Sequence, residues 1–285
     1  MTPKLIIVQQ FYQKIEQLLL NIHEPNSRNI PFYNQHHHII NTLKKKIFDT
    51  KTIIRKTDKS KVLHLGTSKQ YQLKSEQFMD KTQAYKIIDH NPLYDIISQI
   101  THCLRTWLTN KYITSKQYEK LLPVRRKCQL AHLYYQPKAH KQGTPLRSIC
   151  ASINSPTAPS SQFLDNLLRP LFKQSTPTSI ENGIYLVQQL KSYSRSEPFT
   201  PKTIFITFDI IDLYTMLNQN RAIFYLRRFL QGDLQLTALD GIPVDVIIKM
   251  CNLVLKNNYF YYDNNYYHQI KGGAMGSSLT LSLAN

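Results

Sequence analysis

The chain has 285 residues, enough for one large domain or two closely packed lobes. Hydrophobic residues make up 42% and aromatic residues 11%, which favours a folded core over disorder. No apolar run reaches the roughly 18–20 residues that a membrane-spanning helix needs. The segment Met1–Ile22 carries charged residues among its apolar ones, unlike a secretory signal. We therefore expect a folded protein with no membrane partner.

The charge balance is strongly basic. The chain has 36 Lys and Arg residues against 18 Asp and Glu residues, a net charge of +18. Self-repulsion of this size disfavours a compact chain, so a polyanionic partner is expected. Nucleic acid is the first candidate and an anionic membrane surface the second. A coding bias toward Lys, Asn, Ile and Tyr would also produce such a composition.

The cysteines predict the cellular compartment. Cys103, Cys128, Cys150 and Cys251 are scattered without a close pair. This spacing matches neither a zinc site nor a disulfide framework, so reduced thiols inside the cell are expected.

The N-terminal half predicts helices interrupted by two hairpins. The first helix follows the cap-like pair Thr2-Pro3, and its apolar residues recur at spacings of three and four up to Ile22. Further along the chain we expect a helix over 35–48, strands over 52–55 and 62–65, helices over 68–80 and 92–110, and strands over 130–135 and 146–151.

The C-terminal half predicts a mixture of helices and strands, so the expected class is α+β. Its central feature is the short apolar run Thr203–Phe208, which predicts a buried strand that delivers Asp209 to its end. The other expected elements are helices over 160–172, 180–193, 218–230 and 244–256, a tyrosine-rich hairpin over 259–268, and a small-residue segment over 277–285.

Asp209 is the first candidate for chemistry. A carboxylate at a strand end can hold a hard cation, because its oxygens are fixed while the next residues are free to turn. Phosphoryl transfer to a nucleotide commonly uses two such ions, ~3.5–4 Å apart. A turn or a helix cap would also explain a single Asp in this position, and the same alternatives apply to Asp212.

Two further motifs favour phosphate binding. Lys138, Lys141 and Arg147 surround a predicted loop between two strands and could neutralise a triphosphate, with Arg suited to bidentate contacts. A basic surface loop is the simpler explanation. The glycine-rich run 272–276 would let the backbone approach a bulky ligand closely, although it could equally be a turn that enters a helix.

Together and in this order, the motifs resemble the fingers and palm of reverse transcriptases. The resemblance is closest to the Penelope-like retroelement branch, which is akin to telomerase, and it spans roughly 53–285. Two short segments, 57–60 and 78–85, resemble the family upstream. The main segments that carry it are Gln136-Pro137-Lys138-Ala139-His140-Lys141, Pro145 to Ser152, Asn154-Ser155-Pro156-Thr157, Thr207 to Thr215 and Gly272 to Asn285.

The resemblance implies a right-hand polymerase architecture. It implies a helical N-terminal extension over 1–50, fingers over 51–200 and a partial palm over 201–285, without the catalytic hairpin or the thumb. The implied partners are an RNA template, a DNA primer and deoxynucleoside triphosphates. The implied cofactor is Mg²⁺, and the expected location is intracellular and nuclear.

The same resemblance assigns charged residues to the active site. Asp209 would ligate the catalytic magnesium. Lys138 or Lys141, with Arg147, would hold the incoming triphosphate, and Lys59 is a further candidate.

The resemblance also assigns roles to uncharged residues. Tyr214 stands five residues after Asp209, where an aromatic ring would clash with a ribose 2′-hydroxyl. Gly272, Met275 and Gly276 would shape the floor beneath the nascent base pair. Asp212 replaces a small residue of the branch, and we expect it to cap a helix in preference to joining the metal site.

Besides Asp212, the chain departs from the family in four places. Ser60 replaces a glycine, and Ser148 and Ser278 replace prolines. The sequence contains no Tyr-x-Asp-Asp box, which supplies the second catalytic carboxylates of the family. We therefore expect RNA-templated DNA synthesis by two-metal chemistry in a longer parent protein, with this polypeptide inactive alone.

Two alternatives remain open at the level of sequence. One is a non-catalytic module, derived from a retroelement, that binds RNA or RNA–DNA hybrid. The other is a structural or membrane-surface protein, which requires that nucleic acid fails to bind at low salt. Binding of deoxynucleotide and Mg²⁺ separates the polymerase from the module.

Overall fold

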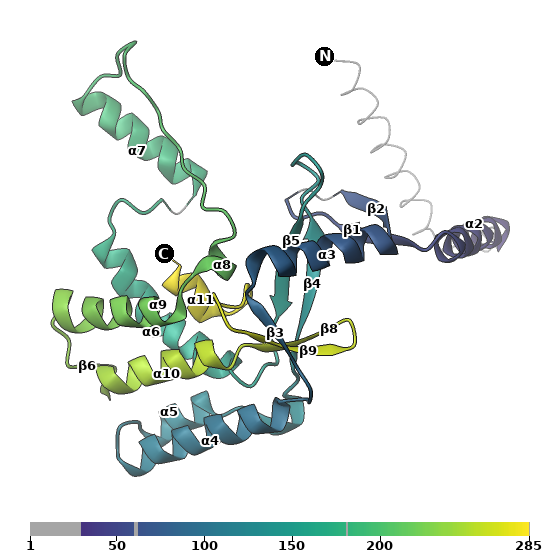
Figure 1. Ribbon diagram of the computed structural model, residues 1–285. Helices are drawn as coiled ribbons and strands as arrows, with labels where there is room; N and C mark the ends of the chain where they lie inside the picture. The colour runs from purple at the N-terminus through teal and green to yellow at the C-terminus, as the bar shows by residue number, and fades with distance from the viewer. Residues whose placement is uncertain (1–29, 60–61, 181, 285) are drawn as a thin grey trace. The chain divides into compact units, whose positions relative to one another are not determined.

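The computed structural model describes residues 30–59, 62–180 and 182–284, with side chains from residue 36 onward. The predicted helix over Thr2–Ile22 lies outside these residues. The α+β class is confirmed, since helices alternate with a mixed five-stranded sheet (Figure 1). The chain forms two compact units, Met1–Ile54 with Leu65–Gln70 and Arg55–His64 with Tyr71–Asn285.

The smaller unit is built on helix α2 (Ile30–Asp49), which covers the helix predicted over 35–48. The helix ends where Thr50 donates its N–H to the carbonyl of Lys46 and Lys51 adopts a positive φ of 48°. The predicted hairpin follows as β1 (Thr52–Lys56) and β2 (Leu63–Thr67), which pair in a two-stranded sheet.

The larger unit contains the five-stranded sheet, in the order β3-β9-β8-β4-β5. Strands β4 and β8 run parallel, and every other neighbouring pair is antiparallel. In the β4–β5 hairpin Pro137 lies opposite Leu146, which places the basic loop 138–145 at its tip. The strands are β3 (Tyr85–Ile88), β4 (Ala131–Pro137), β5 (Leu146–Ala151), β8 (Tyr259–Tyr262) and β9 (Asn265–Gln269).

Helix α3 (Ser68–Thr82) lies across β4 and β5 (Figure 1) and covers one face of the sheet with an aromatic cluster. Tyr135 is fully buried at its centre, and the rings of Tyr71, Phe78 and Tyr262 meet it edge-on at 5.6–6.3 Å. The Tyr71 hydroxyl donates to the Tyr135 carbonyl and accepts from the Tyr135 N–H, which ties the helix to the strand.

A second core consists of helices packed around Leu104, Leu164 and Ile247. Helix α10 has nine buried residues, because its apolar side chains surround most of its circumference. The helix predicted over 218–230 ends in a π-helical turn, η2 (Arg228–Asp233). The helices of this core are α4 (Leu93–Thr109), α5 (Ser115–Leu121), α6 (Ala158–Ser175), α9 (Gln219–Arg227), α10 (Val244–Lys256) and α11 (Ser278–Leu283).

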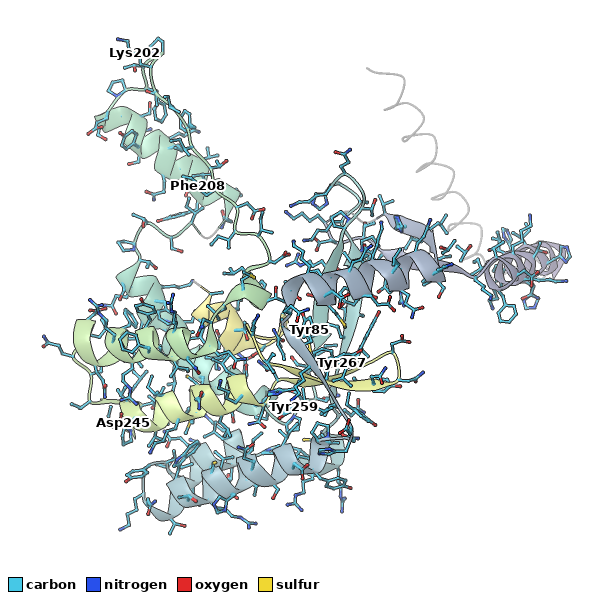
Figure 2. The ribbon with its side chains drawn as sticks, in the orientation of Figure 1. Tyr85, Lys202, Phe208, Asp245, Tyr259 and Tyr267 are labelled. Atoms are coloured by element: carbon cyan, nitrogen blue, oxygen red, sulfur yellow. The ribbon has the colours of Figure 1, made fainter. Side chains whose placement is uncertain are left out.

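The predicted strand over 203–208 is wrong. These residues follow helix α7 (Gly183–Ser196) as an irregular segment, and they pair with no strand in the part of the chain that the structure describes. Phe208 is 92% exposed on this segment (Figure 2). A strand needs a neighbouring backbone for its hydrogen bonds, so an apolar, β-prone run is not sufficient to form one.

Candidate functional site

The three predicted motifs meet at one pocket of about 340 Å³ in the larger unit. The tip of the β4–β5 hairpin forms one side, and the segment 209–215 forms another. The predicted site residues that line it are Lys59, Lys138, Lys141, Arg147, Asp209, Asp212, Tyr214 and Met275. Asp58, Phe78, His140, Leu146 and Ser148 complete most of the remaining wall.

Asp209 faces the basic loop, although no strand carries it. Its carboxylate lies 3.9 Å from Nζ of Lys141, and its side chain is 85% exposed. An exposed ion pair of this kind contributes roughly 0–1 kcal/mol, so either partner can exchange the other for a phosphate or a cation at little cost. Asp209 therefore lies opposite the cationic loop, although the strand predicted to carry it is absent.

Arg147 is held more firmly than Lys141. Its Nη1 donates to Oδ1 of Asp58 at 2.7 Å, and its Nε lies 3.2 Å from the sulfur of Met275. The Asp58 side chain is only 5% exposed. The backbone N–H of Asp58 donates to the carbonyl of Pro137. One guanidinium thus joins residues from three distant segments, with Asp58 as the fixed anchor.

Asp58 is a pocket residue that sequence reasoning missed. The signal for it was its position beside Lys59 within the matched segment 57–60, where only the lysine was considered for phosphate binding. Its contact with Arg147 spans 89 residues of sequence, which no local pattern could indicate.

Asp212 is the N-cap residue of a short helix, but its side chain does not make the cap hydrogen bond. The helix is α8 (Leu213–Met216), and Asp212 has a positive φ of 52°. Its carboxylate instead accepts from Nζ of Lys81 at 2.8 Å. This largely buried carboxylate therefore stands in the pocket wall with a cation beside it.

Gly272 lets two backbone segments of the protein approach each other closely. Its φ is +73°, and a Cβ at this position would lie 1.9 Å from the carbonyl oxygen of Tyr214. The N–H of Gly273 donates to that same carbonyl, and the Gly272 carbonyl accepts from the side chain of Gln219. The glycine allows two backbone segments to touch, which fixes Tyr214 in the pocket wall.

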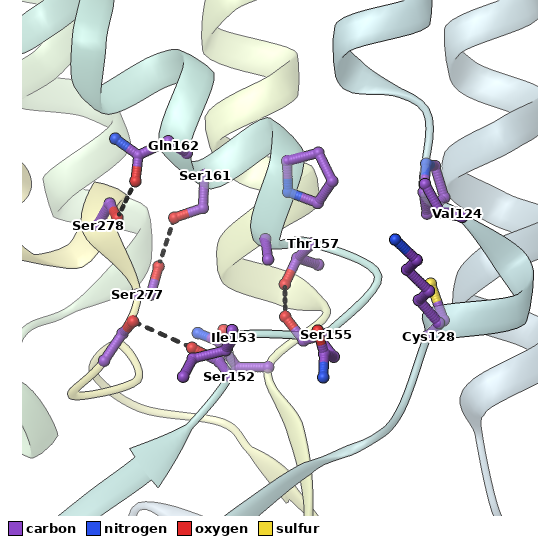
Figure 3. A pocket seen from close by; sticks show the side chains of 17 residues that line it. Val124, Cys128, Ser152, Ile153, Ser155, Thr157, Ser161, Gln162, Ser277 and Ser278 are labelled. Carbon is purple, nitrogen blue, oxygen red and sulfur yellow. Dashed lines mark hydrogen bonds between the residues drawn. The ribbon is translucent and has the colours of Figure 1, made fainter.

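Gly276 has a similar structural role on the other side of the turn. Its φ is +130°, and a Cβ would lie 2.2 Å from the carbonyl of Cys150. The Ser152 hydroxyl donates to the Gly276 carbonyl, and Ser277 is hydrogen-bonded to Ser161 of α6 (Figure 3). Gly276 lines a neighbouring pocket of about 440 Å³ instead of the one that holds Asp209.

Of the three residues predicted to form the floor, only Met275 lines the pocket of Asp209. Gly272 and Gly276 do not line this pocket, and a Cβ at either position would meet a carbonyl oxygen of the protein itself. Their contribution to a ligand would therefore be indirect.

The carboxylates fit a magnesium ion only together with a ligand that supplies further oxygens. The described residues contain no group of three or more His, Cys, Asp or Glu side chains that could hold a metal. Mg²⁺ is commonly bound by one or two carboxylates together with substrate phosphates and water. Asp209 and Asp212 supply such carboxylates on one pocket wall, so they fit a phosphate-bound ion better than an independent metal centre.

The cysteines offer no nucleophile. All four are free thiols, and two of them are buried. Burial raises the pKa of Cys150 to about 12, which keeps it neutral beside the glycine turn.

The chain matches no protein-family model, and no curated protein is significantly similar to it. Among the residues that the structure describes, no helix has the length and apolarity to cross a membrane.

Proposed function

We propose that this chain is a reverse-transcriptase-type domain whose pocket binds a deoxynucleoside triphosphate with Mg²⁺. One observation carries the proposal: Lys141 and Arg147 of the β4–β5 hairpin line the same cavity as Asp209, which comes from a distant segment. Cations on one side and a carboxylate on the other are what a magnesium-bound triphosphate requires. In a longer parent protein this site would serve RNA-templated DNA synthesis.

The proposed architecture assigns α3 and the β4–β5 hairpin to the fingers. The segment around Asp209, helix α10 and the glycine turn belong to the palm. The boundaries at residues 50 and 200 stay predictions, as do the RNA template, the DNA primer and the nuclear location, which rest on the resemblance alone.

Each residue has a defined task in the proposed reaction. Lys138, Lys141 and Arg147 neutralise the triphosphate and orient it toward Asp209. The bound magnesium ion supplies Lewis-acid stabilisation of charge on the phosphate oxygens. Tyr214 lies in the pocket wall, where its ring would exclude a 2′-hydroxyl by steric contact.

A non-catalytic RNA- or hybrid-binding module is the second candidate. It is favoured by the lack of a self-sufficient metal group among the described residues. Both candidates predict salt-dependent binding to nucleic acid, because phosphate contacts release counterions. They differ in whether the pocket takes a nucleotide.

Titration of dTTP and Mg²⁺ into the chain with a primed template tests the proposal. Calorimetry should give saturable heat for the native chain. Lys141→Ala should weaken nucleotide binding about tenfold or more, since charge-assisted hydrogen bonds contribute roughly 1.5–3 kcal/mol each. Asp209→Ala should remove the Mg²⁺ dependence of the remaining affinity.

Lys116→Ala is the matched control, because Lys116 is an exposed lysine on α5 outside the pocket. It should bind nucleotide like the native chain. Absence of heat with the native chain would favour the binding module. Equal losses in Lys116→Ala and Lys141→Ala would mean that net charge, and not the pocket, holds the nucleotide.

A further inference from the structure

The five-stranded sheet has a second face that α3 does not cover. Side chains alternate along each strand, so the neighbours of buried Leu133, Tyr135 and Phe260 point the opposite way. Six rings lie on this opposite face. Tyr259 and His268 stack on each other, and Tyr259 packs against the helical core. The other four rings are those of His132, Tyr134, Tyr261 and Tyr266. All four are described residues that belong to neither hydrophobic cluster.

Three of these rings form a row across adjacent strands. In the sheet register Tyr266 of β9 lies opposite Tyr261 of β8, which in turn lies opposite His132 of β4. The Tyr261 and Tyr266 ring centroids are 5.7 Å apart. Tyr134 extends the row along β4, with its ring centroid 5.9 Å from that of His132.

The row is partly accessible, since Tyr134 and Tyr266 are half-buried while the other two rings are exposed. His132 is exposed, and Tyr261 is 39% exposed. The five strands contain no Asp or Glu, and they contain the exposed Lys86 as well as Arg147, whose charge is paired with Asp58. Partly exposed aromatic rings on strands without acidic residues suit an anionic partner that also offers flat, apolar surfaces.

We propose that this sheet face binds single-stranded nucleic acid by stacking its unpaired bases on Tyr261, Tyr266 and Tyr134. Aromatic residues on an open sheet stack bases without strong sequence preference, since every base has a π-face. The surface goes beyond the nucleotide pocket: it requires neither Mg²⁺ nor Asp209, and paired bases could not reach it. The net charge of +18 would attract the strand electrostatically.

Fluorescence anisotropy with a short fluorescein-labelled oligouridine tests this surface. Tyr261→Ala and Tyr266→Ala should each weaken binding about tenfold, because stacking contributes roughly 1–3 kcal/mol per base. The corresponding Phe variants should bind like the native chain, since they keep the ring. The slope of affinity against salt should stay unchanged in all four variants, because no phosphate contact is removed.

Tyr94→Ala is the control, since Tyr94 is an exposed tyrosine that lies on α4 and belongs to no strand of the sheet. It should retain native affinity. Tyr261→Leu keeps apolar bulk without a ring, so it tests stacking if the Ala variant fails to fold, and it should also bind weakly. Melting temperatures identify any unfolded variant.

Native affinity in folded Tyr261→Leu and Tyr266→Ala would overturn the proposal. Equal losses in the Phe variants would overturn it too, because the hydroxyl and not the ring would then be responsible. A blunt duplex that competes as well as the single strand would show backbone binding without stacking, which also contradicts it. Nucleotide titration into the same variants separates this result from a failure of the pocket, since it should be unaffected.

Discussion

Gly272→Ala should destabilise the larger unit by at least about 3 kcal/mol, placing it among the most damaging single substitutions. Two effects add. The φ of +73° is unfavourable for any residue with a Cβ, and that Cβ would overlap the carbonyl oxygen of Tyr214 at 1.9 Å. The obstacle is backbone, so no rotamer change can relieve it. Urea denaturation of the purified variant measures the loss.

Gly143→Ala provides the comparison. Gly143 has nearly the same φ, +72°, but nothing lies within 4 Å of the position that a Cβ would occupy. Only the backbone term applies, so a loss of roughly 1–2 kcal/mol is expected. Equal destabilisation by both substitutions would show that close approach to Tyr214 contributes nothing, and would contradict the packing argument for the glycine turn.

Asp58→Ala should cost about 2 kcal/mol of folding stability, the second largest effect expected. The carboxylate is almost completely buried and accepts from Arg147 at 2.7 Å. Removing one partner of a fully buried pair costs roughly 3–5 kcal/mol, and the value here is reduced because the Arg147 side chain is 35% exposed and can reach water. A double-mutant cycle with Arg147→Ala measures the coupling directly.

A second ion pair in the same pocket is the control for this double-mutant cycle. Lys141 and Asp209 form a second ion pair, but at 3.9 Å and with both side chains exposed. Its coupling energy should be below about 1 kcal/mol and should fall with added salt, whereas the coupling of Asp58 with Arg147 should be larger and less sensitive to salt. Coupling energies in the reverse order would refute the assignment of Asp58 as the anchor of Arg147.

Local patterns were sufficient for most of the fold. Helix α10 begins and ends at the predicted residues, and the tyrosine-rich hairpin forms around the predicted turn. Both depend on neighbours within a few residues: a helical repeat of apolar side chains, and turn residues between two β-prone runs. The basic loop 138–145 was predictable for the same reason, since its two strands are close in sequence.

The site itself was only partly predictable. The sequence identified Lys141, Arg147 and Asp209 as candidates, and the tertiary structure brings them to one cavity. The sequence did not indicate that Asp58 holds Arg147, or that the Asp212 side chain pairs with Lys81. Each of these contacts joins residues about ninety or more positions apart, and their formation depends on how the whole sheet and its helices fold.

By itself, then, the sequence determined the order of the helices and hairpins, the basic character of the chain and the residue types gathered at the pocket. The tertiary structure alone decided that 203–208 forms no strand, and that Gly272 and Gly276 lie against carbonyl oxygens of the protein. The physical reason is common to both. Whether a strand forms, or what a glycine accommodates, is set by the backbone that lies beside it in space, and that neighbour comes from a distant part of the chain.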